Sequence, residues 1–378
     1  MSKKVAIITH YYKSFNYGGN LQAYALTKKI LELGFDVEQI CFDSYGGVRT
    51  GKIKKILKML NPKFAIGYFK NKKTQKKISS RFFKISQFNN QAIPHTKKIY
   101  NEDNIFECEN KYDAFITGSD QVWNLKWYYP AYFLQFAPSD KVKFSYAASM
   151  SMQDLDDEQK SKIKEHLSDY CAISVREKDT VNLLNDLVTC PIEWVLDPTL
   201  LLSKAEWDLL SSKRIVDSPY VFCYFLGNDQ NERDVAEKFA EENGLTLVTL
   251  PYLGSKYRKC DNKFGDVQLF ATGIEDFISL IKHAEYIFTD SFHATVFSSI
   301  FEKQYFVFQR KAHKGMGSRI YTLCELFEST ERFCDTEEKA CLEYINSLNT
   351  IDYTKSLEML LEMKEKSINY LKENLKRI

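Results

Sequence analysis

Short apolar runs rich in β-forming residues alternate with segments of helical periodicity along most of the sequence, and this alternation constrains the fold more than any other feature. Residues 5–9 predict a buried strand, and residues 21–33 predict a helix that ends at Gly34. The other strand-like runs of this first series are 35–41, 114–117, 142–147, 173–176 and 194–196, with helices predicted at 157–170 and 178–187. Because strands that alternate with helices usually pair in parallel, the series predicts a Rossmann-like α/β unit.

A second series of the same kind begins after Pro219. Its predicted strands are 220–226, 246–250, 286–289 and 305–308, and its predicted helices are 230–242, 274–283 and one that begins near residue 294. At 378 residues the chain is long enough for two domains. We therefore predict an N-terminal domain of residues 1–205, a C-terminal domain of residues 206–350, and an amphipathic helix within 351–378 that packs back on the body.

The composition argues against several other classes of protein. An apolar fraction of 44% and a formal charge of +2 are typical of a globular protein rather than a disordered or histone-like one. The nine cysteines include no CxxC pair, so we expect neither a zinc site nor a disulfide framework. The first apolar run is too short for a signal peptide, and no run approaches the roughly 20 residues of a membrane span. These features predict a cytoplasmic protein.

One long segment is strongly basic. Between Asp43 and Glu102 the sequence contains no carboxylate but fifteen lysine or arginine residues, and we interpret residues 49–98 as an insertion in the N-terminal domain. The insertion is either a surface that contacts the inner face of an anionic membrane or a lipid-linked, phosphate-bearing acceptor, or a solvated helical segment whose charge is balanced elsewhere. Because the whole chain is nearly neutral and has no recognisable nucleic-acid-binding module, we expect no nucleic-acid partner.

Polar motifs follow several of the predicted strands, at the sheet edge where ligands bind in open α/β folds. The first motif, HYYKSFNYGGNLQ, spans residues 10–22. Its glycines allow close approach of the backbone to a ligand, and Asn20 can cap a helix whose N-terminus favours an anion. A plain strand-to-helix turn explains the same residues. The candidate binding residues here are Asn16, Gly18, Gly19, Asn20 and Gln22.

The second motif, GSDQVWN, spans residues 118–124. Its hydroxyl, carboxylate and amide groups, together with an indole that offers a stacking surface, suit a sugar ligand. A loop that only caps the following helix would need the serine or the aspartate but not the tryptophan. The candidate binding residues here are Gly118, Ser119, Asp120, Gln121 and Trp123.

The third motif, DSFHATVFSS, spans residues 290–299 and opens a helix of the second series. His293 would lie near the helix N-terminus, where the helix dipole favours the neutral imidazole and the ring can face a cleft. That placement suits a general acid or base, and the alternative is a structural or capping role.

Two cationic features complete the set of candidates. Arg176 ends a predicted strand in SVREK, and the run RKAHKGMGSR extends from Arg310 to Arg319. Arginine binds phosphate and carboxylate groups through two parallel hydrogen bonds. The alternative for Arg176 is an ion pair with Glu177 or another nearby acid.

In content and in order, these motifs resemble the polysaccharide pyruvyl transferase family. The segments that carry the resemblance are NYGGNLQAYAL, GSDQVWN, YAAS at 146–149, SVRE, VLDPTLLL at 195–202 and TDSFHATVFSS. The resemblance extends over roughly residues 5–326, apart from the basic insertion. It implies two Rossmann-like domains that face each other across a cleft, as in type B glycosyltransferases. It also implies transfer of pyruvate from phosphoenolpyruvate to two hydroxyls of one sugar in exopolysaccharide or cell-surface glycan biosynthesis.

The resemblance further implies roles for individual residues. The family's proposed acid/base histidine belongs to an Arg-Leu-His type motif and falls on His293, but Ser291 and Phe292 replace the arginine and the leucine. Arg176 matches a family arginine thought to hold the donor, and we expect Arg319 to supply the charge that Ser291 lacks. We assign the acceptor to the N-terminal domain, and the donor and the catalytic histidine to the C-terminal domain.

The residue types agree with this chemistry. Phosphoenolpyruvate carries a phosphate and a carboxylate, so its site needs cations or N–H donors, which Arg176, Arg319 and the helix N-termini supply. One acid/base, His293, would serve for the proton transfers, without a metal or redox cofactor.

Two other functions stay open at this point. A nucleotide-sugar-dependent glycosyltransferase uses the same kind of fold, although Glu275 and Asp276 are the only evident candidates for a ribose-binding carboxylate. A catalytically silent family member that binds glycan would explain why Ser291 stands where the family has arginine.

Overall fold

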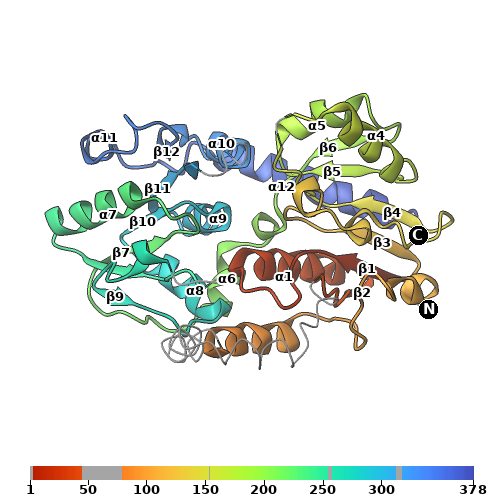
Figure 1. Cartoon of the computed structure of the whole chain (residues 1–378), viewed down its shortest axis with the longest axis horizontal. Helices are drawn as coiled ribbons and strands as arrows, with labels where there is room; N and C mark the ends of the chain where they lie inside the picture. The colour runs from red at the N-terminus through yellow and green to blue at the C-terminus, as the bar shows by residue number, and fades with distance from the viewer. Residues whose placement is uncertain (1–2, 45–78, 153, 254–257, 312–316) are drawn as a thin grey trace, which may run out of the picture.

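The computed structural model of the chain describes residues 3–44, 79–152, 154–253, 258–311 and 317–378. Two α/β units lie side by side along the longest axis of the molecule, and each is built around a parallel sheet (Figure 1).

The first sheet contains four parallel strands in the order β2-β1-β3-β4. Their bounds are β1 Lys4–Ile8, β2 Asp36–Gln39, β3 Ala114–Thr117 and β4 Val142–Ser145. A parallel pair, β5 Ile173–Val175 and β6 Ile192–Trp194, continues this layer through isolated bridges from β4. The winding of the chain reverses between β1 and β3, and such a switch point is where open α/β sheets bind ligands. The first two motifs begin at the carboxyl ends of these two strands.

The second sheet contains six parallel strands in the order β12-β11-β10-β7-β8-β9. Their bounds are β7 Tyr220–Tyr224, β8 Thr246–Thr249, β9 Val267–Gln268, β10 Tyr286–Thr289, β11 Gln304–Phe308 and β12 Phe333–Cys334. This is the doubly wound order of dinucleotide-binding folds, with its switch point between β7 and β10. The third motif begins at the carboxyl end of β10.

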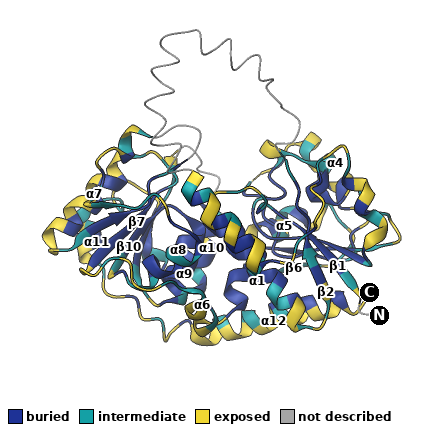
Figure 2. Ribbon diagram, turned by 90° about the horizontal axis from the view of Figure 1, so that it is seen from below, coloured by how far each residue is buried: buried dark blue, intermediate teal, exposed yellow. Residues whose placement is uncertain are grey.

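Helices cover both faces of the two sheets, with their apolar sides inward and their polar sides exposed (Figure 2). Those that follow strands of the first sheet are α1 Tyr17–Glu32, α4 Asp157–His166 and α5 Lys178–Asn185. The later helices are α6 Lys204–Leu210, α7 Gln230–Glu242, α8 Ile274–Lys282, α9 Phe292–Ile300, α10 Ser318–Leu326, α11 Leu342–Ser347 and α12 Leu357–Leu375. Short 3-10 turns lie at Ile105–Lys111, Leu125–Trp127, Pro130–Phe133, Pro198–Leu201, Lys259–Asp261 and Thr330–Arg332.

The two units are joined by a shared hydrophobic core. Helix α1 of the first unit packs against α8 and α9 of the second. The Tyr17 ring stacks on the Phe277 ring with a centroid distance of 4.6 Å, and the Tyr17 hydroxyl lies 2.5 Å from the hydroxyl of Thr272. Aromatic pairs of this kind contribute about 0.5–1.5 kcal/mol beyond their buried area. This contact sets the position of the N-terminus of α1 relative to α9.

The C-terminal helix returns to the first sheet. In α12, the side chains of Tyr370, Leu371 and Leu375 are buried in a cluster that includes Val5 of β1. The Tyr370 hydroxyl donates to the Ser145 carbonyl at 2.9 Å, at the end of β4. The last residues of the chain therefore cover the unit with which the chain began.

Most predicted elements are present with ends that differ by a few residues, but two helices begin earlier than expected. Helix α1 begins at Tyr17 because the Asn16 side chain accepts a hydrogen bond from the Gly18 amide at 3.0 Å. The prediction that Asn20 caps this helix is wrong, since its amide group donates to the Asn16 carbonyl inside the helix. Helix α9 begins at Phe292.

The basic insertion is only partly described. Its residues 49–78 lie outside the described ranges, whereas 79–92 are helical. Arg81 joins this helix to the second unit by donating to the carbonyls of Phe270, Pro251 and Leu269. Of the helices in the described ranges, none combines the length and the apolar character that crossing a membrane requires.

Candidate active site

The N-terminus of α1 meets the N-terminus of α9 at the junction of the two units. A Cβ atom added to Gly18 would lie 2.0 Å from Nδ1 of His293, so the imidazole fills the space that a side chain at position 18 would occupy. Gly19 is equally close to the backbone, since a Cβ there would lie 2.5 Å from the His10 carbonyl oxygen. The glycine pair therefore allows the histidine of one unit to contact the first helix of the other.

His293 is the second residue of α9, two positions after the capping residue Ser291. Its side chain is buried, and its Nε2 atom lies 3.6 Å from Oδ2 of Asp197. Within the described part of the chain Nε2 has no hydrogen-bond partner. At this separation the contact is electrostatic rather than a hydrogen bond. One ring nitrogen thus faces a carboxylate, which would stabilise the protonated imidazole during proton transfer.

Asp197 connects the histidine to the first unit. Its Oδ2 accepts hydrogen bonds from Ser119 Oγ at 2.9 Å and Arg176 Nη1 at 3.1 Å, while Oδ1 accepts from the Thr199 amide and hydroxyl. Burial alone would raise the pKa of Asp197, but the positive charges of His293 and Arg176 and these hydrogen bonds hold it well below its usual range. Asp197 is therefore a buried, ionised residue.

Arg176 and Arg319 both lie close to the ring of Phe292. The guanidinium carbon of Arg176 is 4.3 Å from the centroid of the Phe292 ring, and that of Arg319 is 6.0 Å from it. Arg176 pairs with Asp197 and, through Nε at 3.3 Å, with Glu177. Both arginines are buried, and each retains an N–H nitrogen without a partner in the described ranges, Nη2 of Arg176 and Nε of Arg319.

Arg319 is the less compensated of the two cations. Burial, together with the positive charges of Arg310 and Arg176, lowers the pKa of Arg319 to about 9. Its guanidinium is therefore still charged at neutral pH. The binding of an anion would offset the unfavourable burial of this charge. The site thus combines two buried cationic donors with one imidazole.

Asp120 contributes a second carboxylate from the first unit. Its backbone has a φ of 73°, a left-handed conformation that non-glycine residues seldom adopt. Burial would raise the pKa of Asp120, but the positive charges of Arg176, His293, His10 and Arg319 lower it below its ordinary value. These influences place Asp120 beside the same cluster of charges.

The space next to the arginines is small. A void of about 20 Å³ is lined by Arg176, Asp197, Phe292 and Arg319 together with apolar side chains. A void of this size holds about one water molecule. A substrate anion therefore needs more room than this void provides.

Several candidates from the sequence do not face this space. The prediction that Trp123 offers a stacking surface for sugar is wrong, because its indole is fully buried against Phe133 and donates to the Tyr132 carbonyl. Four other candidates contact neighbouring parts of the first unit instead. Gly118 packs on Thr9, and Asn20 forms hydrogen bonds with Asn16 and Asn89. Gln22 donates to Thr9 and the Gly19 carbonyl, and Gln121 contacts His10 and Asn124.

Three residues near the cluster were not among the predicted site residues. In the sequence, Asp197 stood out only as part of the segment VLDPTLLL, and Glu177 only as an ion-pair partner for Arg176. His10 lies at the start of the first motif, where burial lowers its pKa against the opposing charge of Asp120. His10 could have been found from the sequence, because it follows a predicted strand. Asp197 could not, because its interactions join parts of the chain that are distant in sequence.

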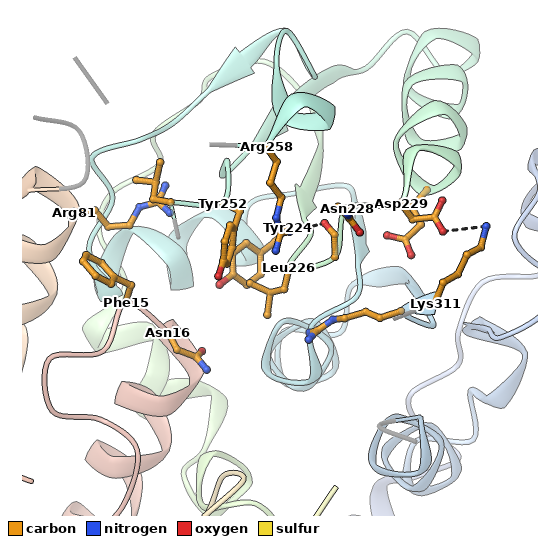
Figure 3. Close-up of a pocket in the computed structure, with 14 residues that line it drawn as sticks. Phe15, Asn16, Arg81, Tyr224, Leu226, Asn228, Asp229, Tyr252, Arg258 and Lys311 are labelled. Atoms are coloured by element: carbon orange, nitrogen blue, oxygen red, sulfur yellow. Dashed lines mark hydrogen bonds and ion pairs between the residues drawn. The ribbon is translucent and has the colours of Figure 1, made fainter. Parts of the chain in front are cut away.

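A larger cavity lies beside this cluster, lined mostly by the second unit and partly by the first. It has a volume of about 500 Å³, and its lining includes Asn16, Glu232, Tyr252, Arg258 and Arg310 (Figure 3). Nowhere in the described ranges do three or more histidine, cysteine, aspartate or glutamate side chains form a group that could hold a metal ion.

Glu232 in this cavity should make the stability of the protein pH-dependent. Burial and the negative charges of Asp290 and Asp229 raise the pKa of Glu232 to about 9. Because the folded-state pKa lies above that of the unfolded chain, the folded protein binds this proton more tightly. The resulting stabilisation is fully present below about pH 4.5 and is lost as pH rises towards 9. Glu232→Gln should therefore be more stable than the wild type by about 1–3 kcal/mol at pH 8 and similar to it at pH 4.5.

Urea denaturation of both proteins at several pH values measures this difference. Glu158→Gln, which changes an exposed glutamate of α4, is the matched control and should show no such trend. A difference between Glu232→Gln and the wild type that is the same at every pH would contradict the neutral, buried carboxyl.

Comparison with known proteins gives a family match. The sequence model described as polysaccharide pyruvyl transferase matches residues 16–311. Among curated proteins, none matches the chain significantly.

Solved structures with a similar fold include two UDP-N-acetylglucosamine 2-epimerases. A protein from Listeria monocytogenes described as a candidate enzyme of this kind has a TM-score of 0.54 and 11% identity, over 97% of this chain and 91% of its own. The enzyme from Methanocaldococcus jannaschii, in complex with UDP-GlcNAc and UDP, has a TM-score of 0.51 and 12% identity, over 96% and 99% of the two chains. At such low identity these similarities show the fold alone. The expected α/β fold with two facing parallel-sheet units is confirmed.

Proposed function

The chain belongs to the polysaccharide pyruvyl transferase family, and on that premise we propose that it transfers pyruvate from phosphoenolpyruvate to two hydroxyls of one sugar. The product is a pyruvate ketal on an exopolysaccharide or cell-surface glycan, or on its lipid-linked precursor. We place the reaction in the cytoplasm, where phosphoenolpyruvate is the donor substrate and no cofactor takes part.

The observation that carries this proposal is the pair of arginines beside Phe292. Arg176 and Arg319 are buried, and each retains an N–H nitrogen without a partner among the described residues. Arg176 also shares the Asp197 carboxylate with His293. A small dianionic ligand would satisfy both donors and the uncompensated charge of Arg319. Phosphoenolpyruvate combines a phosphate and a carboxylate on three carbon atoms, so it offers one anionic group to each guanidinium.

The reaction requires a defined order of proton transfers. His293, as the imidazolium, gives a proton to the methylene carbon of the donor, and the first sugar hydroxyl adds to C2 and loses its proton. The bond between C2 and the bridging oxygen then breaks, so that phosphate leaves with that oxygen. The second hydroxyl adds to C2 and loses its proton, and one of the two released protons leaves on the phosphate while the other restores His293. Asp197 stabilises the imidazolium, and the arginines stabilise the negative charge on the phosphate.

The rival glycosyltransferase function has less support from the residues. Asp276, one of its two candidate ribose-binding carboxylates, accepts a hydrogen bond from the Gly273 amide and pairs with Lys84 at 2.8 Å. It is thus occupied as the cap of α8. The silent, glycan-binding alternative is weakened by the proximity of Arg319, which provides a cation near the position where Ser291 replaces the family arginine.

Incubation with phosphoenolpyruvate and a library of lipid-linked or nitrophenyl glycosides tests the proposal. We expect release of inorganic phosphate and, by mass spectrometry, a product that has gained one pyruvate less one water. A parallel panel of nucleotide sugars should give no transfer. Glycosyl transfer from a nucleotide sugar without consumption of phosphoenolpyruvate would favour the rival function.

Removal of the charge at Arg319 should weaken donor binding more than it slows the chemical step. We expect Arg319→Gln to raise KM for phosphoenolpyruvate by about 10- to 100-fold, because a charge-assisted hydrogen bond to phosphate is lost. Arg319→Lys should recover part of the loss. Initial-rate kinetics check this, with Arg214→Gln as the control, since Arg214 is exposed and donates only to carbonyls of its own loop. An unchanged KM in folded Arg319→Gln would remove Arg319 from the donor site.

A further inference from the structure

The cavity of about 500 Å³ lies at the switch point of the second sheet, where ligands bind in doubly wound folds. Gly227 after β7 and Asp290 after β10 meet there, since the Asp290 carboxylate accepts hydrogen bonds from the amides of Leu226 and Gly227. The cavity is far larger than the void beside Arg319, and its volume is typical of a pocket for a small organic ligand.

The cavity carries excess positive charge. In Figure 3 the side chains of Tyr252 and Arg258 lie together on one wall, and the guanidinium carbon of Arg258 is 3.7 Å from the centre of the tyrosine ring. In the part of the chain that the structure describes, Arg258 donates to the Gly227 carbonyl, and Arg81 donates to three other carbonyls. These bonds satisfy N–H groups without neutralising either charge.

The acidic residues of the cavity do not offset these two arginines. Asp229 pairs with Lys311 at 3.0 Å, and Arg310 pairs with Asp290 at 3.2 Å. Glu232 is buried, its Oε2 has no partner among the described residues, and its raised pKa keeps it protonated at neutral pH. A protonated carboxyl can donate a hydrogen bond to an oxygen of a ligand. The cavity can therefore bind an anion through the positive charges of Arg258 and Arg81. It can also bind a hydroxyl or ether oxygen through the protonated carboxyl of Glu232.

Two residues of the cavity lining neighbour the candidate active site. Asn16 caps the helix whose Gly18 touches His293. Arg310, also in the lining, donates to the carbonyl of Asp290, three residues before His293. The cavity therefore lies next to the elements that carry the imidazole.

We propose that this cavity binds a phosphoryl group attached to the acceptor sugar, so that the acceptor is a glycosyl phosphate or diphosphate rather than a free sugar. Arg258 and Arg81 hold the phosphoryl oxygens, Glu232 donates to a sugar oxygen, and Tyr252 covers one face of the ligand. The proposal depends on the function proposed above, because it assigns the second substrate of the same reaction. A nucleotide and a polyprenyl carrier both supply this chemistry.

Calorimetric titration of the full chain, without phosphoenolpyruvate, tests the proposal. The probes are N-acetylglucosamine, its 1-phosphate, UDP-N-acetylglucosamine and a farnesyl diphosphate-linked N-acetylglucosamine. At least one phosphorylated probe should bind ten-fold or more tightly than the free sugar, and the tightest one identifies the carrier. Arg258→Gln should weaken that binding by about 10- to 100-fold, Arg258→Lys should weaken it less, and the exposed control Arg214→Gln should leave it unchanged.

Three results would overturn the assignment. They are equal binding of free and phosphorylated probes, no binding below about 1 mM, and displacement of the probe by phosphoenolpyruvate, which would place the donor in this cavity. The turnover assay separates this proposal from the proposed function. Pyruvyl transfer to a sugar without phosphate, combined with no phosphate binding, would reject the cavity assignment alone, whereas phosphate binding without any donor consumption would reject the reaction.

Discussion

Replacement of His293 with alanine should lower the rate of pyruvyl transfer by about 100- to 10,000-fold while the protein stays folded. The imidazole of His293 lies against Gly18 of the first unit and faces Asp197, which also binds Arg176. Without it, the methylene carbon of the donor loses the proton donor that we assign to it. Binding of phosphoenolpyruvate should change much less, because the arginines carry most of the donor's charge. Initial rates and donor titration of the purified variant measure both quantities.

A matched control is available in the first unit. His166 is also buried, and its ring stacks on Tyr128 and contacts the tyrosine hydroxyl at 2.7 Å, away from the site. His166→Ala should keep the rate within about two-fold once the fraction of folded protein is taken into account. Turnover of folded His293→Ala at the wild-type rate would exclude His293 as the acid/base.

The second large effect concerns stability. Asp197→Asn should lower the free energy of unfolding by about 3–5 kcal/mol, because Arg176 and His293 would lose their shared buried counter-charge. Asparagine has one acceptor oxygen, whereas both carboxylate oxygens of Asp197 accept hydrogen bonds, from Ser119, Arg176 and Thr199. The NH2 group of the asparagine would therefore lie opposite hydrogen-bond donors and could not accept their hydrogen bonds. Guanidinium denaturation monitored by circular dichroism measures the loss.

The same substitution predicts a pH dependence of known sign. Since the pKa of Asp197 in the folded protein is depressed, its contribution is present above the unfolded value of about 4 and is lost as pH falls further. The difference in the free energy of unfolding between the wild type and Asp197→Asn should therefore become smaller at acidic pH. Asp156→Asn is the control, because Asp156 caps exposed helix α4 and asparagine caps equally well. Equal losses in the two variants would contradict a buried charge network at Asp197.

Much of the fold was predictable because it depends on local patterns. Strand β10 and helix α7 have the bounds that their apolar periodicity predicts, since each is buried on the expected side and bounded by polar residues. The start of α1 was not predictable in the same way. Gly18 and Gly19 resemble a turn in sequence, and they are helical because Asn16 caps them and His293 and the backbone of His10 pack against them.

The residues of the candidate site likewise differ in whether local sequence patterns could reveal them. His293, Arg176 and Arg319 were predictable from strand-end and helix-start positions, and the structure brings them together around Phe292. Asp197 was missed because Asp-Pro is typical of a turn, and only tertiary packing brings the second motif and the third motif to it. Trp123 was assigned wrongly for the opposite reason, because a polar motif gives no signal that its indole points into the core.

If the chain uses phosphoenolpyruvate as a pyruvyl donor, the bond between C2 and the bridging oxygen of the donor breaks during turnover. This is measured by turnover of phosphoenolpyruvate that carries oxygen-18 in the bridge between C2 and phosphorus, with an accepted glycoside. We expect all of the label to appear in inorganic phosphate and the sugar to gain an unlabelled pyruvate ketal. Label that stays with pyruvate, or donor that is not consumed with any acceptor, would contradict pyruvyl transfer by this chain.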